Sequence, residues 1–208
     1  VETRQGYSVG AVLTLQKIAK DIGLVKALGH ERAGRLALWQ VMARVIDQGS
    51  RLSAVRLANH HAVGSVLKLS RFNEDSLYQN LDWLAEHQEA IEETLYRALG
   101  TPSTQLYLYD VTSSYLEGEC NELAAFGYNR DQKKGKKQIV IGLLCNAEGV
   151  PITVEVFKGN TNDSKTLEGK IERTAKRFGV KEVIWVGDRG MIKRAQIEVF
   201  KSLNFHLR

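Results

Sequence analysis

The sequence contains few of the residues that cross-link or interrupt a chain: two cysteines and two prolines occur among its 208 residues. Cys120 and Cys145 are too few and too isolated for a disulfide framework or a zinc site. No apolar run approaches the roughly 20 residues that a membrane-spanning helix needs, and no signal-peptide pattern opens the sequence. These absences predict a reducing, cytoplasmic setting and no membrane partner.

Several familiar catalytic motifs are also absent. The sequence has no Walker-type glycine loop, no dinucleotide-binding fingerprint and no nucleophile elbow. The adjacent pair His60 and His61 does not share a helix face, so it does not predict a metal site. Nothing in these motifs points to a small-molecule substrate.

Charge is distributed in blocks along the chain. The formal net charge is +5 and the pI is about 9.2, which suits a polyanionic partner without requiring one. Residues 2–71 carry eleven basic and four acidic side chains, whereas residues 72–97 carry one basic and seven acidic side chains. The remaining residues, 98–208, have seventeen basic and thirteen acidic side chains. The blocks indicate surfaces with different partners, although solvated helix faces would give the same pattern.

The first hundred residues have helical periodicity. Apolar residues repeat at helical spacing within 9–22, and a second helix is predicted from about Glu31 to before Gly49. Ser50 or Ser53 could cap a third, short helix ending at Ala58. Asn73 followed by two acids predicts the start of a long helix that Gly100-Thr101-Pro102 ends, which makes this tripeptide the best domain boundary.

The second half is predicted to contain both strands and helices. The predicted order is strand, strand, strand, helix, strand, helix and the start of a further strand, with the first strand at 105–111 and a polar loop at 112–135. Asp110 and Asp188 each end an apolar, strand-like run. A carboxylate at the end of a buried strand lies where an open α/β sheet meets solvent. Two such aspartates could share a divalent metal, or each could be a turn residue.

Four segments in the second half strongly resemble bacterial insertion-sequence transposases of the DDE type, in the subgroup with a β-strand insertion domain. The segments are YDVTSSYLEGE (109–119), ELAAFGYNRDQKKGKKQIVIGLL (122–144), VFKGNTND (156–163) and WVGDRGM (185–191). Two segments of the first half, 50–67 and 73–92, are similar to the region before the first catalytic strand of that subgroup. The resemblance implies an α/β protein: a helical N-terminal region, 1–100, for DNA binding or dimerisation, and an incomplete RNase H-like mixed-sheet core, 101–208.

The resemblance also implies a site. Asp110 matches the first catalytic acid and Asp188 the second, and together they would bind Mg²⁺, or Mn²⁺ in its place. The family's third acid, a glutamate, lies beyond the insertion domain, and Glu198 is not in its position. We therefore expect a truncated transposase that is inactive by itself. The parent activity would be DNA cleavage and strand transfer, and the alternative is a non-catalytic DNA-binding or dimerisation fragment that modulates an intact transposase.

Double-stranded DNA, as transposon ends and target, is the predicted partner, and synapsis would require a homodimer. A basic run precedes the second predicted strand and could neutralise DNA phosphates; it consists of Arg130, Lys133, Lys134, Lys136 and Lys137. A solvated hairpin tip is the alternative interpretation. Arg189 could contact a phosphate or pair with a carboxylate, and the segment 50–61 could be a recognition helix or an ordinary amphipathic one.

Overall fold

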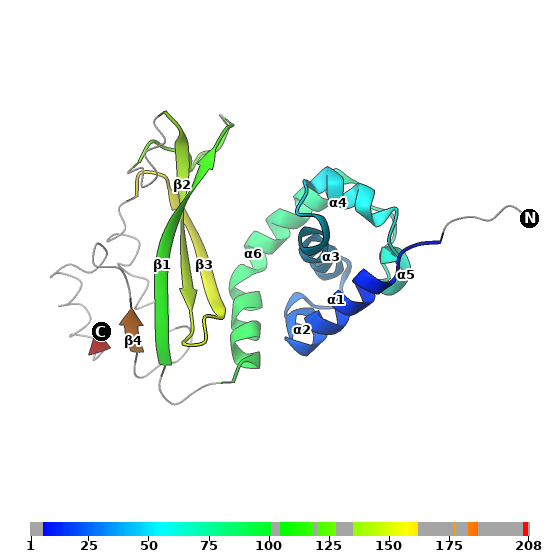
Figure 1. Cartoon of the computed structure of the whole chain (residues 1–208), viewed down its shortest axis with the longest axis horizontal. Coiled ribbons are helices and arrows are strands. Elements are labelled where there is room, and N and C mark those ends of the chain that lie inside the picture. Colours follow the sequence, from blue (N-terminus) through cyan, green and yellow to red (C-terminus); the bar gives the residue numbers. More distant parts are fainter. Residues whose placement is uncertain are drawn as a thin grey trace, which may run out of the picture. The chain divides into compact units, whose positions relative to one another are not determined.

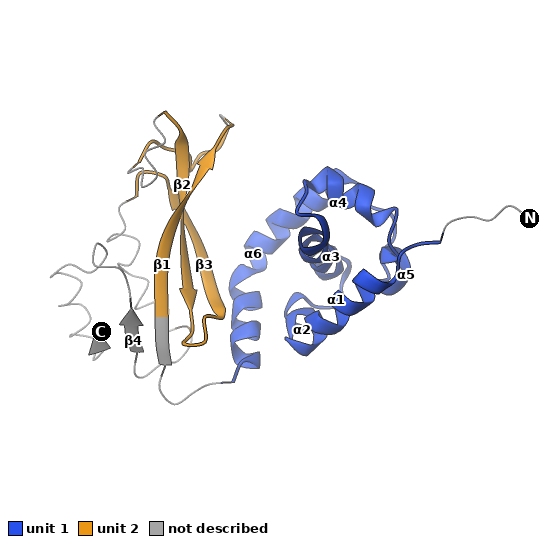
Figure 2. Ribbon diagram, in the orientation of Figure 1, with its two compact units in different colours: residues 1–100 blue, residues 101–208 orange. Residues whose placement is uncertain are grey.

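The computed structural model describes residues 6–100, 105–118, 120–127, 135–161, 177, 183–186 and 206–207. The chain divides into two compact units, residues 1–100 and residues 101–208 (Figure 2). Each unit is described by itself below. No helix in the described ranges is both long enough and apolar enough to span a bilayer.

The regular elements of the described part of the first unit are helices (Figure 1). Its elements are α1 (Gly10–Asp21), α2 (Leu24–Leu28), α3 (Arg32–Asp47), α4 (Arg51–Ala58), α5 (Val63–Val66) and α6 (Glu74–Ala98). Helices α1, α3, α4 and α6 follow the predicted ranges closely, whereas α2 was not predicted as a helix. The short helix α5 has too few residues to show periodicity and was not predicted.

Side-chain caps fix the starts of two helices. The Ser50 hydroxyl accepts a hydrogen bond of 3.1 Å from the Ser53 backbone N–H at the start of α4. At the start of α6, the Asn73 side chain accepts a 3.0 Å bond from the Ser76 N–H, and the Ser76 hydroxyl accepts from the Asn73 N–H in return. Such caps satisfy backbone donors that have no partner inside the helix. The sequence predicted the Asn73 cap, and Ser50 was one of two candidates for the cap of α4.

Helix α3 lies at the centre of the helical core, and most of its faces are buried. Trp39 is fully buried, and its indole N–H donates a 3.2 Å hydrogen bond to the Ala54 carbonyl of α4. Gly34 permits a close approach between α3 and the end of α2, because a Cβ there would lie 2.0 Å from the Leu28 carbonyl oxygen. Met42 of α3 and Leu77 of α6 are also almost completely buried in this core.

A buried amide pair joins α3 to α6. The Gln40 side chain donates to the Asn80 side-chain oxygen at 2.9 Å and to the Leu77 carbonyl at 3.3 Å. Asn80 in turn donates to the Ala33 carbonyl at 3.0 Å, and the Arg51 guanidinium donates to the Gln40 side-chain oxygen at 2.5 Å. Gln40 and Asn80 are each only 4% exposed, so these bonds replace the water that burial removes.

The second unit contains a five-stranded mixed sheet in the order β3-β2-β1-β4-β5. Its strands are β1 (Gln105–Leu116), β2 (Lys137–Cys145), β3 (Pro151–Lys158), β4 (Val183–Val186) and β5 (His206–Leu207). The pairs β1–β2 and β2–β3 are antiparallel, whereas β1–β4 and β4–β5 are parallel. This arrangement confirms the predicted fold class, a helical N-terminal region followed by a mixed sheet.

The sequence interpretation of β1 was wrong at its C-terminal end. The strand continues through Leu116 and pairs along that length with β2, whereas a loop was predicted from Thr112. The misread residues, Thr112 to Tyr115, alternate hydroxyl groups on the exposed face with partly buried side chains on the other. Threonine and tyrosine suit such a half-buried pleated surface, so a polar outer face does not imply a loop.

Candidate functional site

Asp110 lies in the interior of β1, not at its end as the sequence had suggested. It is the register partner of Leu143 on β2, with six further residues of β1 after it. Its side chain is exposed, and one carboxylate oxygen accepts a 2.8 Å hydrogen bond from the backbone N–H of Val111. The carboxylate is thus accessible to a ligand while its backbone is fixed by strand pairs.

The pleat of β1 separates a buried face from the face that carries Asp110. Tyr109 and Val111 point to the buried side, with exposures of 5% and 2%. Asp110, Thr112 and Ser114 alternate with them and are exposed. On the buried side, the Tyr109 ring of β1 packs directly against the backbone of β2. A Cβ on Gly142 would lie 2.3 Å from the Tyr109 hydroxyl oxygen. The buried face is therefore closely packed, and the opposite face presents oxygen-bearing side chains.

The parallel neighbour of β1 is β4. Leu108 pairs with Val186 at the last position of the described register. Asp188 and Arg189, the other residues predicted for this part of the site, lie outside the described residues. Within the described part of the chain, no group of three or more His, Cys, Asp or Glu residues could hold a metal ion.

Of the basic run, Lys136 and Lys137 fall within the described residues, and Arg130, Lys133 and Lys134 do not. The Lys136 ammonium forms an ion pair of 2.5 Å with the Glu117 carboxylate, just beyond β1. The hydrogen bond and the positive charge of Lys136 lower the pKa of Glu117 below its usual 4.5. Lys137 begins β2 opposite Leu116. Sequence reasoning assigned Lys136 to DNA and missed its pairing, because Glu117 lies nineteen residues away in the chain.

The residues just before the basic run are fixed to the sheet by backbone contacts. Ala125 and Gln138 exchange two hydrogen bonds of 3.1 and 3.0 Å, and the Gln138 side chain donates to the Gly159 carbonyl at 2.9 Å. Gly127 and Gly159 approach so closely that a Cβ on Gly127 would lie 1.9 Å from the Gly159 carbonyl oxygen. Gln138, 2% exposed, was not singled out in the sequence, because no local pattern marks a buried glutamine within a strand.

Comparison with known proteins identifies the second unit. Residues 101–207, just over half of the chain, match the family model described as "Transposase DDE domain". The chain belongs to the DDE transposase domain family. No curated protein matches the sequence.

Two solved structures are weakly similar to this chain. They are described as "Mos1 transposase paired-end complex with left transposon end" and "Crystal structure of a pre-cleavage Mos1 transpososome". Both are 11% identical to this chain and cover 83% of it, with TM-scores of 0.34 and 0.29. This chain in turn spans 57% and 58% of those chains. TM-scores this low do not establish a shared fold.

Proposed function

We propose that this DDE-family chain takes part in the DNA cleavage and strand transfer of an insertion sequence, and that Asp110 and Asp188 are two of its metal-binding acids. Family membership over residues 101–207 is the observation that carries the proposal. The exposed position of Asp110 on a strand held by neighbours on both sides supports it.

The register of the two parallel strands supports pairing of these two acids. Asp110 follows Leu108 by two residues, and Asp188 follows Val186 by two residues, while Leu108 and Val186 are register partners. Side chains two residues apart on a strand point to the same face. If the register continued unchanged, the two carboxylates would emerge side by side from the sheet.

A divalent metal is part of the family's chemistry, and the available donors suit it. Carboxylate oxygens are the hard ligands that Mg²⁺ takes in proteins, usually in small number and together with water and phosphate oxygens. Asp110 provides one exposed carboxylate of this kind, with Asp188 as the proposed second. A bound metal would activate the attacking hydroxyl and stabilise the leaving oxygen of a phosphoryl transfer.

The chain's own residues would bind and orient DNA around this site. Lys137 carries positive charge at the start of β2 in the same sheet, where it would neutralise backbone phosphates. The same role is proposed for Arg130, Lys133 and Lys134. Lys136 already pairs with Glu117, so its contribution to DNA affinity should be smaller than that of Lys137. Assembly as a homodimer, which synapsis would require, is part of the same proposal.

Calorimetric titration with Mn²⁺ and Mg²⁺ tests the metal assignment. The variants are Asp110→Asn, Asp188→Asn and, as a matched control, Glu148→Gln, which removes an exposed carboxylate of the β2–β3 turn. We expect the wild type and the control to bind metal and both aspartate variants to lose that binding. Equal binding by all four proteins would refute the metal assignment.

A nicking assay on plasmid DNA with the same four proteins tests the activity. Metal-dependent nicking that disappears in both aspartate variants would establish the enzyme. Metal binding without any nicking would instead favour the alternative, a non-catalytic fragment that modulates an intact transposase.

A further inference from the structure

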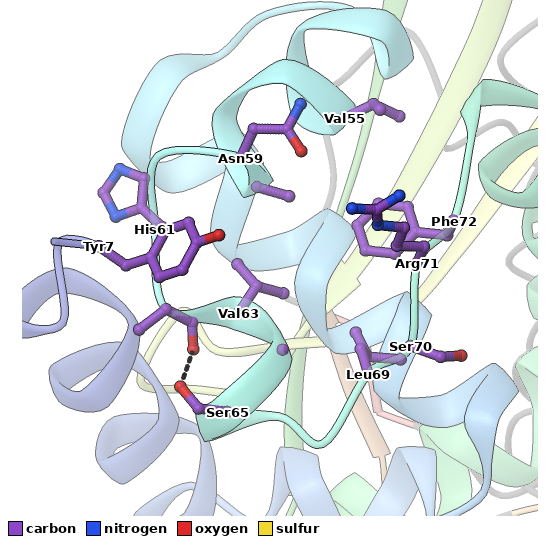
Figure 3. A pocket seen from close by; sticks show the side chains of 13 residues that line it. Tyr7, Val55, Asn59, His61, Val63, Ser65, Leu69, Ser70, Arg71 and Phe72 are labelled. Carbon is purple, nitrogen blue, oxygen red and sulfur yellow. Dashed lines mark hydrogen bonds between the residues drawn. The ribbon is translucent and has the colours of Figure 1, made fainter. Parts of the chain in front are cut away.

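A cavity of about 320 Å³ opens on the helical unit, near the ends of α4 and α5 (Figure 3). Tyr7 lies on one side of it and Arg71 and Phe72 on the other, with Asn59 and Val63 between them in the view. The volume falls at the lower end of the range for small-ligand sites, about 300–1,000 Å³. The family model begins at residue 101 and assigns this cavity no role. Part of the lining lies in the segment 50–61, for which the sequence left a recognition helix open.

Both walls of the cavity are held by specific hydrogen bonds. On the Tyr7 side, the Ser8 N–H donates to the His60 carbonyl, and the Ala62 N–H donates to the Ser8 carbonyl, each at 2.9 Å. This parallel bridge holds the segment before α1 against the turn that follows α4. The bridge positions the backbone next to Tyr7, whose side chain is 67% exposed at the rim of the cavity.

The opposite wall is held from α3. The Arg32 guanidinium donates to the Ser70 hydroxyl at 2.6 Å and to the Arg71 carbonyl at 3.3 Å. These bonds fix the backbone of Arg71 and leave its side chain to face the cavity. The guanidinium of Arg71 has no hydrogen bond or ion pair with any side chain in the described part of the chain.

The side chains that line the cavity include the ring of Tyr7, the amide of Asn59, the positive charge of Arg71 and several apolar groups. Val55, Val63, Leu69 and Phe72 provide apolar surface. The Tyr7 hydroxyl and the Asn59 amide, like Arg71, have no hydrogen-bond partner among the described residues. The lining contains no acidic side chain, so nothing in it repels an anion.

We propose that this cavity binds one unpaired nucleotide of a DNA strand. A base has a π-face that stacks on an aromatic ring and an edge that an amide can read, and its phosphate pairs with a guanidinium. Tyr7, Asn59 and Arg71 provide these three groups around one opening of suitable volume. The inference deepens the proposed function, since it rests on DNA as the partner and assigns the helical unit a contact with an unpaired base.

The test is fluorescence anisotropy of a labelled oligothymidine, compared with a blunt duplex, in EDTA so that metal binding at Asp110 plays no part. Loss of stacking in Tyr7→Ala should weaken binding of the single strand by at least about fivefold, while Tyr7→Phe keeps most of the affinity. Arg71→Gln should lower the salt dependence, the slope of log K against log salt, by about 0.7. Duplex affinity should change little in the tyrosine variants.

The matched control is Tyr78→Ala, which removes a tyrosine of α6 that is 52% exposed and does not line the cavity. Unchanged affinity for the single strand in Tyr7→Ala, or an equal loss in Tyr78→Ala, would overturn the proposal. Tighter binding of free thymidine monophosphate than of the oligomer would overturn the assignment to a DNA strand. Glu148→Gln, the control of the metal titration, should bind the single strand as the wild type does. Because this assay is run in EDTA and the nicking assay needs metal, failure of the proposed cavity and failure of the proposed activity remain distinguishable.

Discussion

Replacing Gln40 by methionine tests whether the buried amide pair holds α3 to α6. The substitution keeps the length of the side chain and removes both hydrogen bonds to α6, leaving the buried Asn80 oxygen without its donor. A buried acceptor that is left without a donor lowers the free energy of unfolding by about 1–3 kcal/mol, and each lost hydrogen bond lowers it by about 1 kcal/mol. The Arg51 guanidinium also loses Gln40 as an acceptor, but it is only partly buried and can bond to water instead. We therefore expect the free energy of unfolding to fall by about 2–4 kcal/mol.

A double-mutant cycle separates this account from simple loss of packing. Asn80→Leu should cost about 1–3 kcal/mol by itself, because Gln40 keeps the Leu77 carbonyl as an acceptor. In the double variant no buried amide of the pair remains unsatisfied, so its loss of stability should be smaller than the sum of the two by about 1–2 kcal/mol.

Urea unfolding followed by far-UV circular dichroism measures all four proteins, and an unchanged m-value in each shows that the same transition is compared. Gln79→Met, on the exposed side of α6, is the control and should leave stability within about 0.5 kcal/mol of the wild type. Additive losses in the double variant would refute the argument, since they would mean that the two amides stabilise the unit independently.

The remaining predictions concern a close backbone approach and an exposed ion pair. Gly34→Ala should destabilise the chain by about 1–3 kcal/mol in the same urea assay, because its Cβ would meet the Leu28 carbonyl. Gly10→Ala, where a Cβ meets nothing within 4 Å, should not. The carboxyl of Glu117, followed by NMR, should titrate below 4.5, and Lys136→Gln should return its pKa toward that value. Because this pKa is lowered on folding, the pair's small stabilisation is present above pH 4.5 and lost as pH falls through the folded pKa. An unchanged titration in Lys136→Gln would contradict that cause.

Local signals predicted the helical unit well. The side chains of Ser50 and Asn73 bond to backbone N–H groups three residues ahead, so the information for each helix start lies within one turn of sequence. The apolar periodicity of α3 likewise reflects burial. Its sequence does not reveal that Gln40 is buried, because the residues that satisfy it lie on other helices.

The candidate site was only partly predictable, because some of its features depend on contacts between segments that are distant in the sequence. Asp110 could be placed on the first strand by its apolar neighbours, but its position within that strand depends on pairing between β1 and β2. The ion pair of Lys136 and the cavity beside Tyr7 each join segments distant in the chain. Tertiary contacts of this kind leave no periodic trace, whereas caps and alternating burial do.

The parallel pairing of β1 with β4 has a consequence for the order in which the chain can fold. The pairs β1–β2 and β2–β3 join neighbours in the sequence, whereas Leu108 meets a partner seventy-eight residues later at Val186. Closing so long a loop costs entropy that hairpin formation avoids, and non-local pairing of this kind is slow. During synthesis, the antiparallel part of the sheet can therefore form while β4 is still being made. Asp110 would emerge from the ribosome on a strand with one neighbour and gain its second only near the end of this sequence.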